Sequence, residues 1–303
     1  MPSPRAIALG VAAAGAVAGL AYARAEASSY RLRRVRVPAP EPGMDMRILH
    51  LSDLHMTPRR RRLREWVSSL ASLAPDYVVA TGDFLAHPEA IPPALDALGP
   101  LRDIPGAFVL GSNDYYAPRP INPFQYFAGP SDVDPRRAEL PWPELVASLE
   151  SSGWAHLANA DATVDVRGIT MHIRGVDDPH IERDDYTAIS GRADAELSLG
   201  IAHAPYLRVI DAMAADGVDI MLAGHTHGGQ VRVPGVGALV TNCDLPPDRA
   251  RGMSSYPRSA AMPSTAGPPR PMLLHVSAGL GTSPYAPVRF ACPPEATLIT
   301  IEG

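Results

Sequence analysis

The stretch RILHLSDLH, residues 47–55, decides the fold, because a short apolar run ends there in a group of polar side chains. Outward from it, helical patterns such as 62–73 alternate with further apolar runs, at 77–83, 106–112, 197–203 and 219–225. Short apolar runs that alternate with helical patterns indicate helices packed on a sheet. The sequence therefore predicts a layered α/β (α+β) domain.

Potential metal ligands stand where four of these runs end: Asp53, His55, Asp83, His203, His225 and His227. In extended backbone the side chains at positions i and i+2 point the same way, so Asp53 and His55 can converge on one ion. Carboxylates mixed with imidazoles suit Mn, Fe or Zn better than a metal that prefers oxygen alone. Six such groups exceed the needs of one ion, whereas two divalent ions roughly 3.5–4 Å apart and bridged by a carboxylate use them all.

Each candidate also has a structural interpretation. Asp53 alone suits a helix N-cap, Asp83 suits a turn, and His203 suits a hydrogen-bonded core position. We favour the metal site because these residue types recur at four separate strand ends, which the structural interpretations do not explain.

Four motifs in one order, SDLH (52–55), TGD (81–83), HAP (203–205) and GHTHGGQ (224–230), resemble the calcineurin-like metallophosphoesterases. Flanking residues at 47–55, 228–232 and 290–301 resemble one branch, the bacterial membrane-associated YkuE/YaeI-like phosphoesterases. The resemblance implies a four-layer β-sandwich flanked by helices, with an N-terminal hydrophobic helix. The implied ligands are Asp53, His55 and His227 for the first metal, Asp83 as the bridge, and His203 and His225 for the second metal.

One element departs from the family pattern. The usual Gly-Asn-His-Asp, whose Asn binds the second metal and whose His helps to protonate the leaving group, here reads Gly111-Ser112-Asn113-Asp114. An ungapped match puts Ser112 at the ligand position. An amide oxygen is a better ligand than a neutral hydroxyl, so we predict that Asn113 binds the metal instead. No histidine stands at the acid position in either case; Asp114 is a conceivable substitute, although we favour a capping role for it.

The function that these features predict is a two-metal-dependent phosphoester hydrolase, acting near a membrane as a phosphodiesterase by attack of a metal-bound hydroxide. The expected substrate is a phosphoester, with lipid-linked and wall-linked compounds as candidates. A phosphomonoesterase for a soluble substrate and a catalytically weakened metal-binding partner protein are the alternatives. A net charge of −5 and an isoelectric point near 6.0 argue against nucleic-acid binding.

The N-terminus carries an uncharged run at residues 6–23, AIALGVAAAGAVAGLAYA. Its length just suffices to span a bilayer, so residues 1–27 are predicted to be a transmembrane anchor, on a membrane face that the sequence leaves open. A cleaved signal peptide, and therefore secretion, is the alternative. Residues 28–45 are assigned to a basic, Pro-rich linker and residues 46–303 to the metallophosphoesterase domain.

Two other segments interrupt the alternation of strands and helices, and a third forms a turn. Residues 115–142 and 244–271 are rich in Pro, so the first is predicted to be a long loop and the second to be mobile or disordered. Residues 177–180, DDPH, follow a strand-like run and are predicted to be a turn that can reach the rim of the site.

Overall fold

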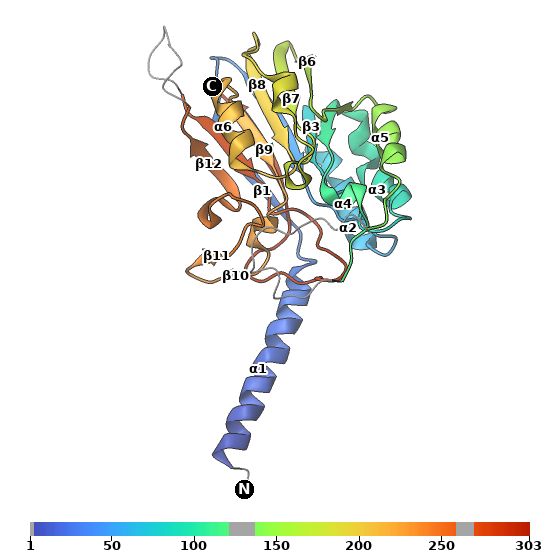
Figure 1. Cartoon of the computed structure of the whole chain (residues 1–303), viewed down its shortest axis with the longest axis vertical. Coiled ribbons are helices and arrows are strands. Elements are labelled where there is room, and N and C mark those ends of the chain that lie inside the picture. Colours follow the sequence, from blue (N-terminus) through green and yellow to red (C-terminus); the bar gives the residue numbers. More distant parts are fainter. Residues whose placement is uncertain (1–2, 121–136, 259–269) are drawn as a thin grey trace.

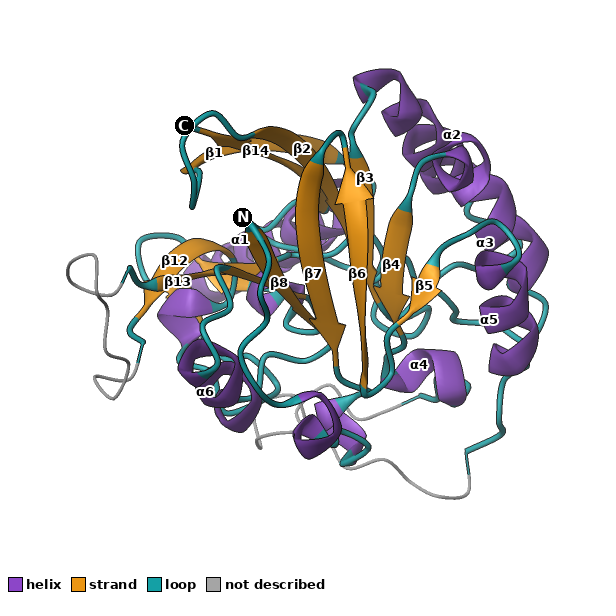
Figure 2. Cartoon of the chain, turned by 90° about the horizontal axis from the view of Figure 1, so that it is seen from above, coloured by secondary structure: helices purple, strands orange, loops and turns teal. Residues whose placement is uncertain are grey.

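Two sheets face each other in the computed structural model, which describes residues 3–120, 137–258 and 270–303 (Figure 2). Over these residues the first sheet has six strands, ordered β1 (Arg31–Pro38), β14 (Glu295–Glu302), β2 (Asp45–Leu51), β3 (Tyr77–Thr81), β4 (Gly106–Val109) and β5 (Ala155–His156). The second has six over the same residues, ordered β12 (Gly252–Tyr256), β13 (Met272–Val276), β9 (Ile220–Ala223), β8 (Leu197–Ala202), β7 (Ile169–Gly175) and β6 (Ala160–Val166).

Parallel pairing dominates the middle of both sheets. Strands β2 to β5 are parallel in the first sheet, as are β7, β8, β9 and β13 in the second. Parallel neighbours need crossover connections, which is why helical patterns separate the apolar runs along the sequence. The predicted mixed α/β fold is confirmed.

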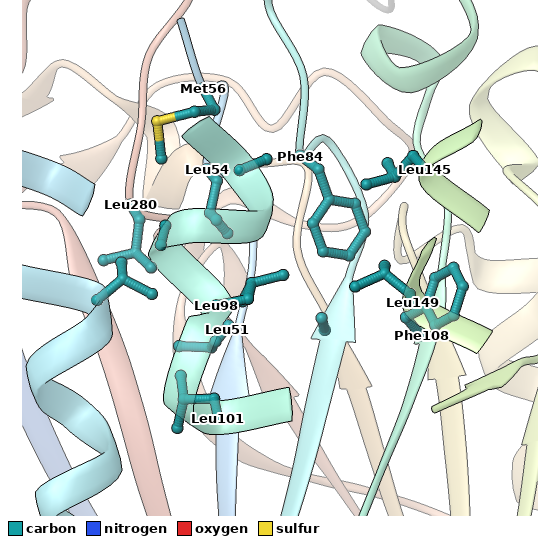
Figure 3. Packing of buried hydrophobic residues seen from close by; sticks show 14 of the residues in the cluster. Leu51, Leu54, Met56, Phe84, Leu98, Leu101, Phe108, Leu145, Leu149 and Leu280 are labelled. Atoms are coloured by element: carbon teal, nitrogen blue, oxygen red, sulfur yellow. The ribbon is translucent and has the colours of Figure 1, made fainter. Parts of the chain in front are cut away.

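Apolar side chains fill the space between the sheets and cover both outer faces. Ile48 and Val79 of the first sheet belong to one buried cluster with Leu199 and Leu222 of the second. On the other face of the first sheet lie α2 (Arg61–Ser69), α3 (Ile91–Leu98) and α5 (Trp142–Glu150), and α6 (Leu207–Ala215) lies on the second sheet (Figures 2 and 3).

Each of these helices buries residues spaced four apart, which places them on one helix face. The pairs are Leu63 and Val67 in α2, Ala94 and Leu98 in α3, Leu145 and Leu149 in α5, and Ile210 and Ala214 in α6. Shorter elements, α4 (Ser112–Tyr115), β10 (Arg232–Val233) and β11 (Gly237–Ala238), lie in loops beside the sheets.

The N-terminal run forms a helix, α1 (Pro4–Glu26), that projects from the rest of the chain (Figure 1). Among the described residues, however, no helix is long and apolar enough to cross a membrane. The predicted transmembrane anchor and membrane localisation are therefore wrong. The physical reason is composition, because Ala and Gly fill most of this helix and add little hydrophobicity.

The final turn of α1 is instead packed against the folded body. Ala23 and Glu26 are buried there, and the rings of Tyr22 and Phe290 form a T-shaped contact with 5.3 Å between their centroids. One carboxylate oxygen of Glu26 also accepts a hydrogen bond of 3.1 Å from the backbone N–H of Cys292.

Residues 31–38, which the sequence assigned to a linker, form the edge strand β1 in parallel pairing with β14. Val35 and Val37 lie on the face that packs in the core between the sheets, whereas Arg34 and Arg36 lie on the opposite face and are exposed. Arg33 forms an ion pair with the buried Glu295 of β14. Strand β12 likewise lies in the segment 244–271 that was predicted to be mobile or disordered, whereas residues 121–136 and 259–269 lie outside the described part of the chain.

Candidate metal centre

The candidate ligands gather at one end of both sheets. Strand β2 leads into Asp53 and His55, β3 into Asp83, β8 into His203, and β9 into His225 and His227. Because β2 pairs in parallel with β3, and β8 with β9, the carboxyl ends of each pair lie side by side. Five of the six side chains are buried, and that of His227 is half-buried.

Asp53, His55 and His227 form one group whose ligand atoms lie within 4.8 Å of one another. The imidazoles of His55 and His227 are stacked, and their Nε2 atoms are 3.1 Å apart. The distance from His227 Nε2 to Asp53 Oδ1 is 3.6 Å. These atoms therefore surround a common point rather than pairing off with partners elsewhere.

Asp53, Asp83 and His203 form a second group under the same limit of 4.8 Å. Oδ2 of Asp83 lies 3.4 Å from His55 Nε2 and 3.5 Å from His203 Nε2. The Asp83 carboxylate thus stands between an imidazole of each sheet, which is the placement that a bridging ligand requires.

Hydrogen bonds fix which nitrogen of two imidazoles faces the centre. His203 Nδ1 lies 2.7 Å from the Thr81 carbonyl oxygen and therefore donates to it. Its Nε2, turned toward Asp83, is buried and has no hydrogen-bond partner in the described part of the chain. His225 Nε2 lies 3.0 Å from the Asn242 carbonyl oxygen, so Nδ1 is the nitrogen left for a ligand.

His225 belongs to neither group of three, although its ring packs against His203 with 5.2 Å between centroids. Its backbone N–H donates to both oxygens of Asp53, at 3.2 and 3.1 Å. The structure thus brings five of the candidate Asp and His residues together in two groups that share Asp53, and it places His225 at their edge.

Asn113 lies against Asp83, with its amide nitrogen rather than its amide oxygen toward the carboxylate. Its backbone N–H donates to Asp83 Oδ1 at 2.9 Å, and its side-chain Nδ2 donates to Oδ2 at 2.7 Å. Its Oδ1 accepts a hydrogen bond of 3.1 Å from Arg137. A half-turn of the amide group would present the oxygen to an ion beside Asp83, at the cost of the bond from Arg137.

The neighbours of Asn113 have structural positions. Ser112 is the first residue of α4 and is buried. Asp114 accepts hydrogen bonds from the backbone N–H groups of Gly111 and Leu85, each 2.9 Å long, and so caps α4 and holds two loops together. Asp114 therefore has the capping position that the sequence favoured.

The backbone at the site differs from the extended conformation that the sequence suggested. Positive φ angles occur at Asp53 (52°), His55 (43°), Asp83 (55°), His225 (68°) and His227 (49°). The side chains converge because left-handed turns follow the strands, not because of strand alternation. Such conformations cost about 1–3 kcal/mol each in non-glycine residues and are typical of functional sites.

Close approach of the backbone requires glycine at Gly224, the first residue of GHTH. A Cβ atom there would lie 2.6 Å from Asp53 Oδ2. This contact explains physically why a glycine precedes the two histidines in that motif.

Burial keeps most of the imidazoles neutral. It lowers the pKa of His55 to about 4 and holds the pKa values of His225 and His227 well below the ordinary value. A neutral imidazole has a lone pair on one nitrogen, which is the form that binds a metal. At neutral pH these three side chains are therefore in the ligating form.

The two carboxylates leave negative charge to be balanced. Burial, reinforced by the charge of Asp83, raises the pKa of Asp53 to about 6. Burial also opposes ionisation of Asp83, but His203 and His55 hold the pKa of this carboxyl below its ordinary value. Burial lowers the pKa of His203, but carboxylates led by Asp83 outweigh it and raise that pKa to about 9. The donor set therefore fits divalent cations, which would supply the positive charge that a protonated His203 otherwise provides.

Arg289 is a neighbour of the site that had no signal in the sequence. It is fully buried, and its Nη2 lies 3.2 Å from His227 Nδ1.

The segment 177–180 reaches the rim of the site, as the sequence suggested. The ring of His180 lies 4.4 Å from that of His225. Asp178 is buried beside it, and its Oδ2 has no hydrogen-bond partner among the residues described.

Comparison with known proteins connects this geometry to a family. Residues 46–229 match the family described as calcineurin-like phosphoesterase, and the match includes all six candidate Asp and His ligands. YpbG of Bacillus subtilis (strain 168), an uncharacterized protein, is 26% identical over 261 residues, covering 84% of this chain and 81% of that protein. The uncharacterized metallophosphoesterase YkuE of the same organism is 23% identical over 268 residues, covering 85% of this chain and 79% of YkuE. The UDP-2,3-diacylglucosamine pyrophosphatase LpxG of Chlamydia trachomatis is 28% identical over 295 residues, covering 84% of this chain and 83% of LpxG.

Proposed function

Since this chain belongs to the calcineurin-like phosphoesterase family and is a metal-dependent phosphoester hydrolase, we propose that it binds two divalent ions and acts as a phosphodiesterase. The proposed ligands are Asp53, His55 and His227 for the first ion, His203, His225 and Asn113 for the second, and Asp83 as the bridge. Mn, Fe and Zn suit this mixture of oxygen and nitrogen donors.

One observation carries the proposal. His55 Nε2 and His227 Nε2 face each other at 3.1 Å, with Asp83 Oδ2 at 3.4 Å from the first and Asp53 Oδ1 at 3.6 Å from the second. Two neutral imidazoles can share only one proton in such a contact. The arrangement of both nitrogens beside two carboxylates therefore suits a cation at their common centre.

Bound ions of this kind supply Lewis acidity, which lowers the pKa of water and offsets negative charge on phosphoryl oxygens. The protein's own part is to hold the ligands in place. Asp83 is oriented by the hydrogen bond from the backbone N–H of Asn113, and His203 by its bond to the Thr81 carbonyl oxygen. Burial of these side chains excludes bulk water, which strengthens every electrostatic interaction at the site.

The substrate that we propose has a leaving group that departs without much help from an acid, because no histidine stands at the acid position of the Gly111–Asp114 element. Phosphate is such a group, since its second pKa is about 6. LpxG, whose similarity covers 84% of this chain, is named a UDP-2,3-diacylglucosamine pyrophosphatase. This name supports a lipid-linked pyrophosphate diester as substrate.

The test is hydrolysis by the full-length chain with Mn²⁺. We expect turnover of bis(p-nitrophenyl) phosphate, a diester with good leaving groups, to exceed that of the monoester p-nitrophenyl phosphate. Faster turnover of the monoester would favour a phosphomonoesterase. Stoichiometric binding of Mn²⁺ without turnover of either compound would indicate a metal-binding partner protein.

Substitution of the two histidines of GHTH is expected to remove different ions. His227→Ala should lose the ion of the first site and His225→Ala the ion of the second. Each variant should therefore retain about one ion per chain, as measured by inductively coupled plasma mass spectrometry. His87→Ala, at an exposed position, is the control and should retain two. Two ions in both His225→Ala and His227→Ala would mean that these histidines are structural.

Substitution of Asn113 separates the two alignments of the Gly111–Asp114 element. If Asn113 is the amide ligand, Asn113→Ala should lower turnover of bis(p-nitrophenyl) phosphate at least about tenfold, whereas Ser112→Ala should change it little. Asn113→His should also lower turnover, because an imidazole does not reproduce the geometry of the amide. A gain in turnover of substrates with poor leaving groups, toward the roughly 10²–10⁴-fold that a general acid provides, would instead favour the ungapped alignment.

A further inference from the structure

A chain of buried polar side chains runs from the second sheet to Asp53. His275 Nδ1 lies 2.9 Å from His50 Nδ1, and His50 Nε2 lies 2.9 Å from Thr81 Oγ1. Thr81 Oγ1 lies 2.8 Å from Ser52 Oγ, which lies 2.6 Å from Asp53 Oδ2. Four successive hydrogen bonds thus connect an imidazole of β13 to a carboxylate that belongs to both groups of candidate ligands.

All members of this chain are fully buried, with about 1% or less of each side chain exposed to solvent. His50 belongs to β2, Thr81 ends β3, and His275 belongs to β13 in the other sheet. Placing two imidazoles and two hydroxyls in the core is unfavourable unless each is hydrogen-bonded, and apolar side chains would fill the same space at a lower cost in desolvation free energy. The position of this hydrogen-bonded series directly behind Asp53 therefore suggests a role at the site.

Donor and acceptor chemistry gives the chain one direction. A carboxylate that binds a metal has no proton, so Ser52 donates to Asp53 and accepts from Thr81. Thr81 has then used its only hydrogen and must accept from His50 Nε2. His50 Nδ1 is in consequence an acceptor, and His275 Nδ1 is the donor.

The protonation of the two imidazoles agrees with this assignment. Burial lowers the pKa of His50 well below its ordinary value and that of His275 to about 4, so each carries one proton at pH 7. With that proton on Nδ1 of His275, its Nε2 is a bare acceptor, and this atom has no hydrogen-bond partner in the portion of the chain that the structure describes. The N–H of His275 Nδ1 is thus the first donor of the series.

We propose that His275 and His50 are positioning residues that act through Thr81 and Ser52 to hold the Asp53 carboxylate in its metal-binding orientation. The inference rests on the proposed function, because it assigns these side chains to the same metal centre. Without the N–H of His275, the His50 proton can move to Nδ1, and the Thr81 hydroxyl can then turn toward His50. Ser52 would lose its donor and could share its own hydrogen with the Thr81 carbonyl oxygen, 3.4 Å away, instead of giving it to Asp53.

A pair of substitutions with the same shape tests the donor at the start of the chain. His275→Leu removes it, whereas His275→Asn keeps an N–H close to the position of Nδ1, and Leu and Asn leave similar space. We expect His275→Leu to weaken Mn²⁺ binding to the metal-free full-length chain by about tenfold, measured by isothermal titration calorimetry. We expect His275→Asn to remain within about threefold of the wild type.

Removing the last hydrogen bond of the series, from Ser52 to Asp53, gives a second test. Ser52→Ala should weaken Mn²⁺ binding by about 10–100-fold, because it removes the hydrogen bond to the ligand itself. If His275 acts through Ser52, the double variant with His275→Leu should bind Mn²⁺ no more weakly than Ser52→Ala alone. Thermal unfolding of the metal-free proteins checks that His275→Leu and His275→Asn are folded and similarly stable.

The outcomes separate this inference from the function on which it rests. Equal Mn²⁺ affinities of His275→Leu and His275→Asn, whether both weakened or both unchanged, would contradict the positioning role while leaving the metal centre intact. Additive effects of Ser52→Ala and His275→Leu would contradict transmission through Ser52. A wild-type chain that binds no Mn²⁺ would overturn the proposed metal centre, and this inference with it.

Discussion

Asp83→Asn is expected to lower hydrolysis of bis(p-nitrophenyl) phosphate by at least about a thousandfold while the fold survives. The substitution keeps the shape of the side chain but removes the negative charge that lies between His55 Nε2 and His203 Nε2, at 3.4 and 3.5 Å. A bridging carboxylate serves both ions, and the transition-state stabilisation that such ions provide is worth several kcal/mol. Metal content should fall together with activity.

A matched control is Asp96→Asn, which makes the same chemical change at an exposed position of α3 and should keep full activity. Circular dichroism and thermal unfolding establish that both variants are folded. Wild-type metal content and turnover in Asp83→Asn would remove the basis for assigning a bridge.

Removal of divalent ions is expected to abolish hydrolysis completely. After dialysis against a chelator, turnover of bis(p-nitrophenyl) phosphate should fall to the uncatalysed rate, and Mn²⁺ should restore it. Ca²⁺ should not, because a site rich in imidazole disfavours a cation that prefers oxygen ligands. Binding also stabilises the fold, by about 2.7 kcal/mol per site at a Mn²⁺ concentration of 100 times Kd, so the Tm should rise by several degrees.

Activity that persists in a preparation shown to contain no metal would contradict this account. A Tm that does not respond to Mn²⁺ would count against ions bound to the folded state, because any ligand specific for the native protein must raise its stability.

Much of the fold could be predicted from hydrophobic patterning, since continuous apolar runs such as 77–81 are buried strands and the patterns between them are helices. Strand β1 could not, because four arginines in RLRRVRVP suggested a linker. Its half-buried edge position depends on pairing with β14, which lies more than 250 residues later in the chain. Long-range pairing of this kind has no local signal. The predicted membrane anchor failed because length was given more weight than the low hydrophobicity of Ala and Gly.

The clustering of the candidate ligands has a clear signal in the sequence, because these residues follow strands whose ends lie at one edge of the sheets. The way in which they meet was not predicted, since positive φ at residues such as Asp53 and His227 is a tertiary property. The chain from His275 to Ser52 was missed for a related reason. His50 and His275 are 225 positions apart, and nothing in either local sequence indicates that one imidazole donates to the other.

The central claim is that the Asp and His residues at these strand ends hold two divalent ions, and ion stoichiometry tests it most directly. The full-length chain, stripped of metal and then loaded with excess Mn²⁺, should retain two ions per chain after gel filtration, as measured by inductively coupled plasma mass spectrometry. Asp53→Ala should reduce this number to one or none, because Asp53 belongs to both groups of ligands. Fewer than two ions in the wild type, or two ions retained in Asp53→Ala, would contradict the account.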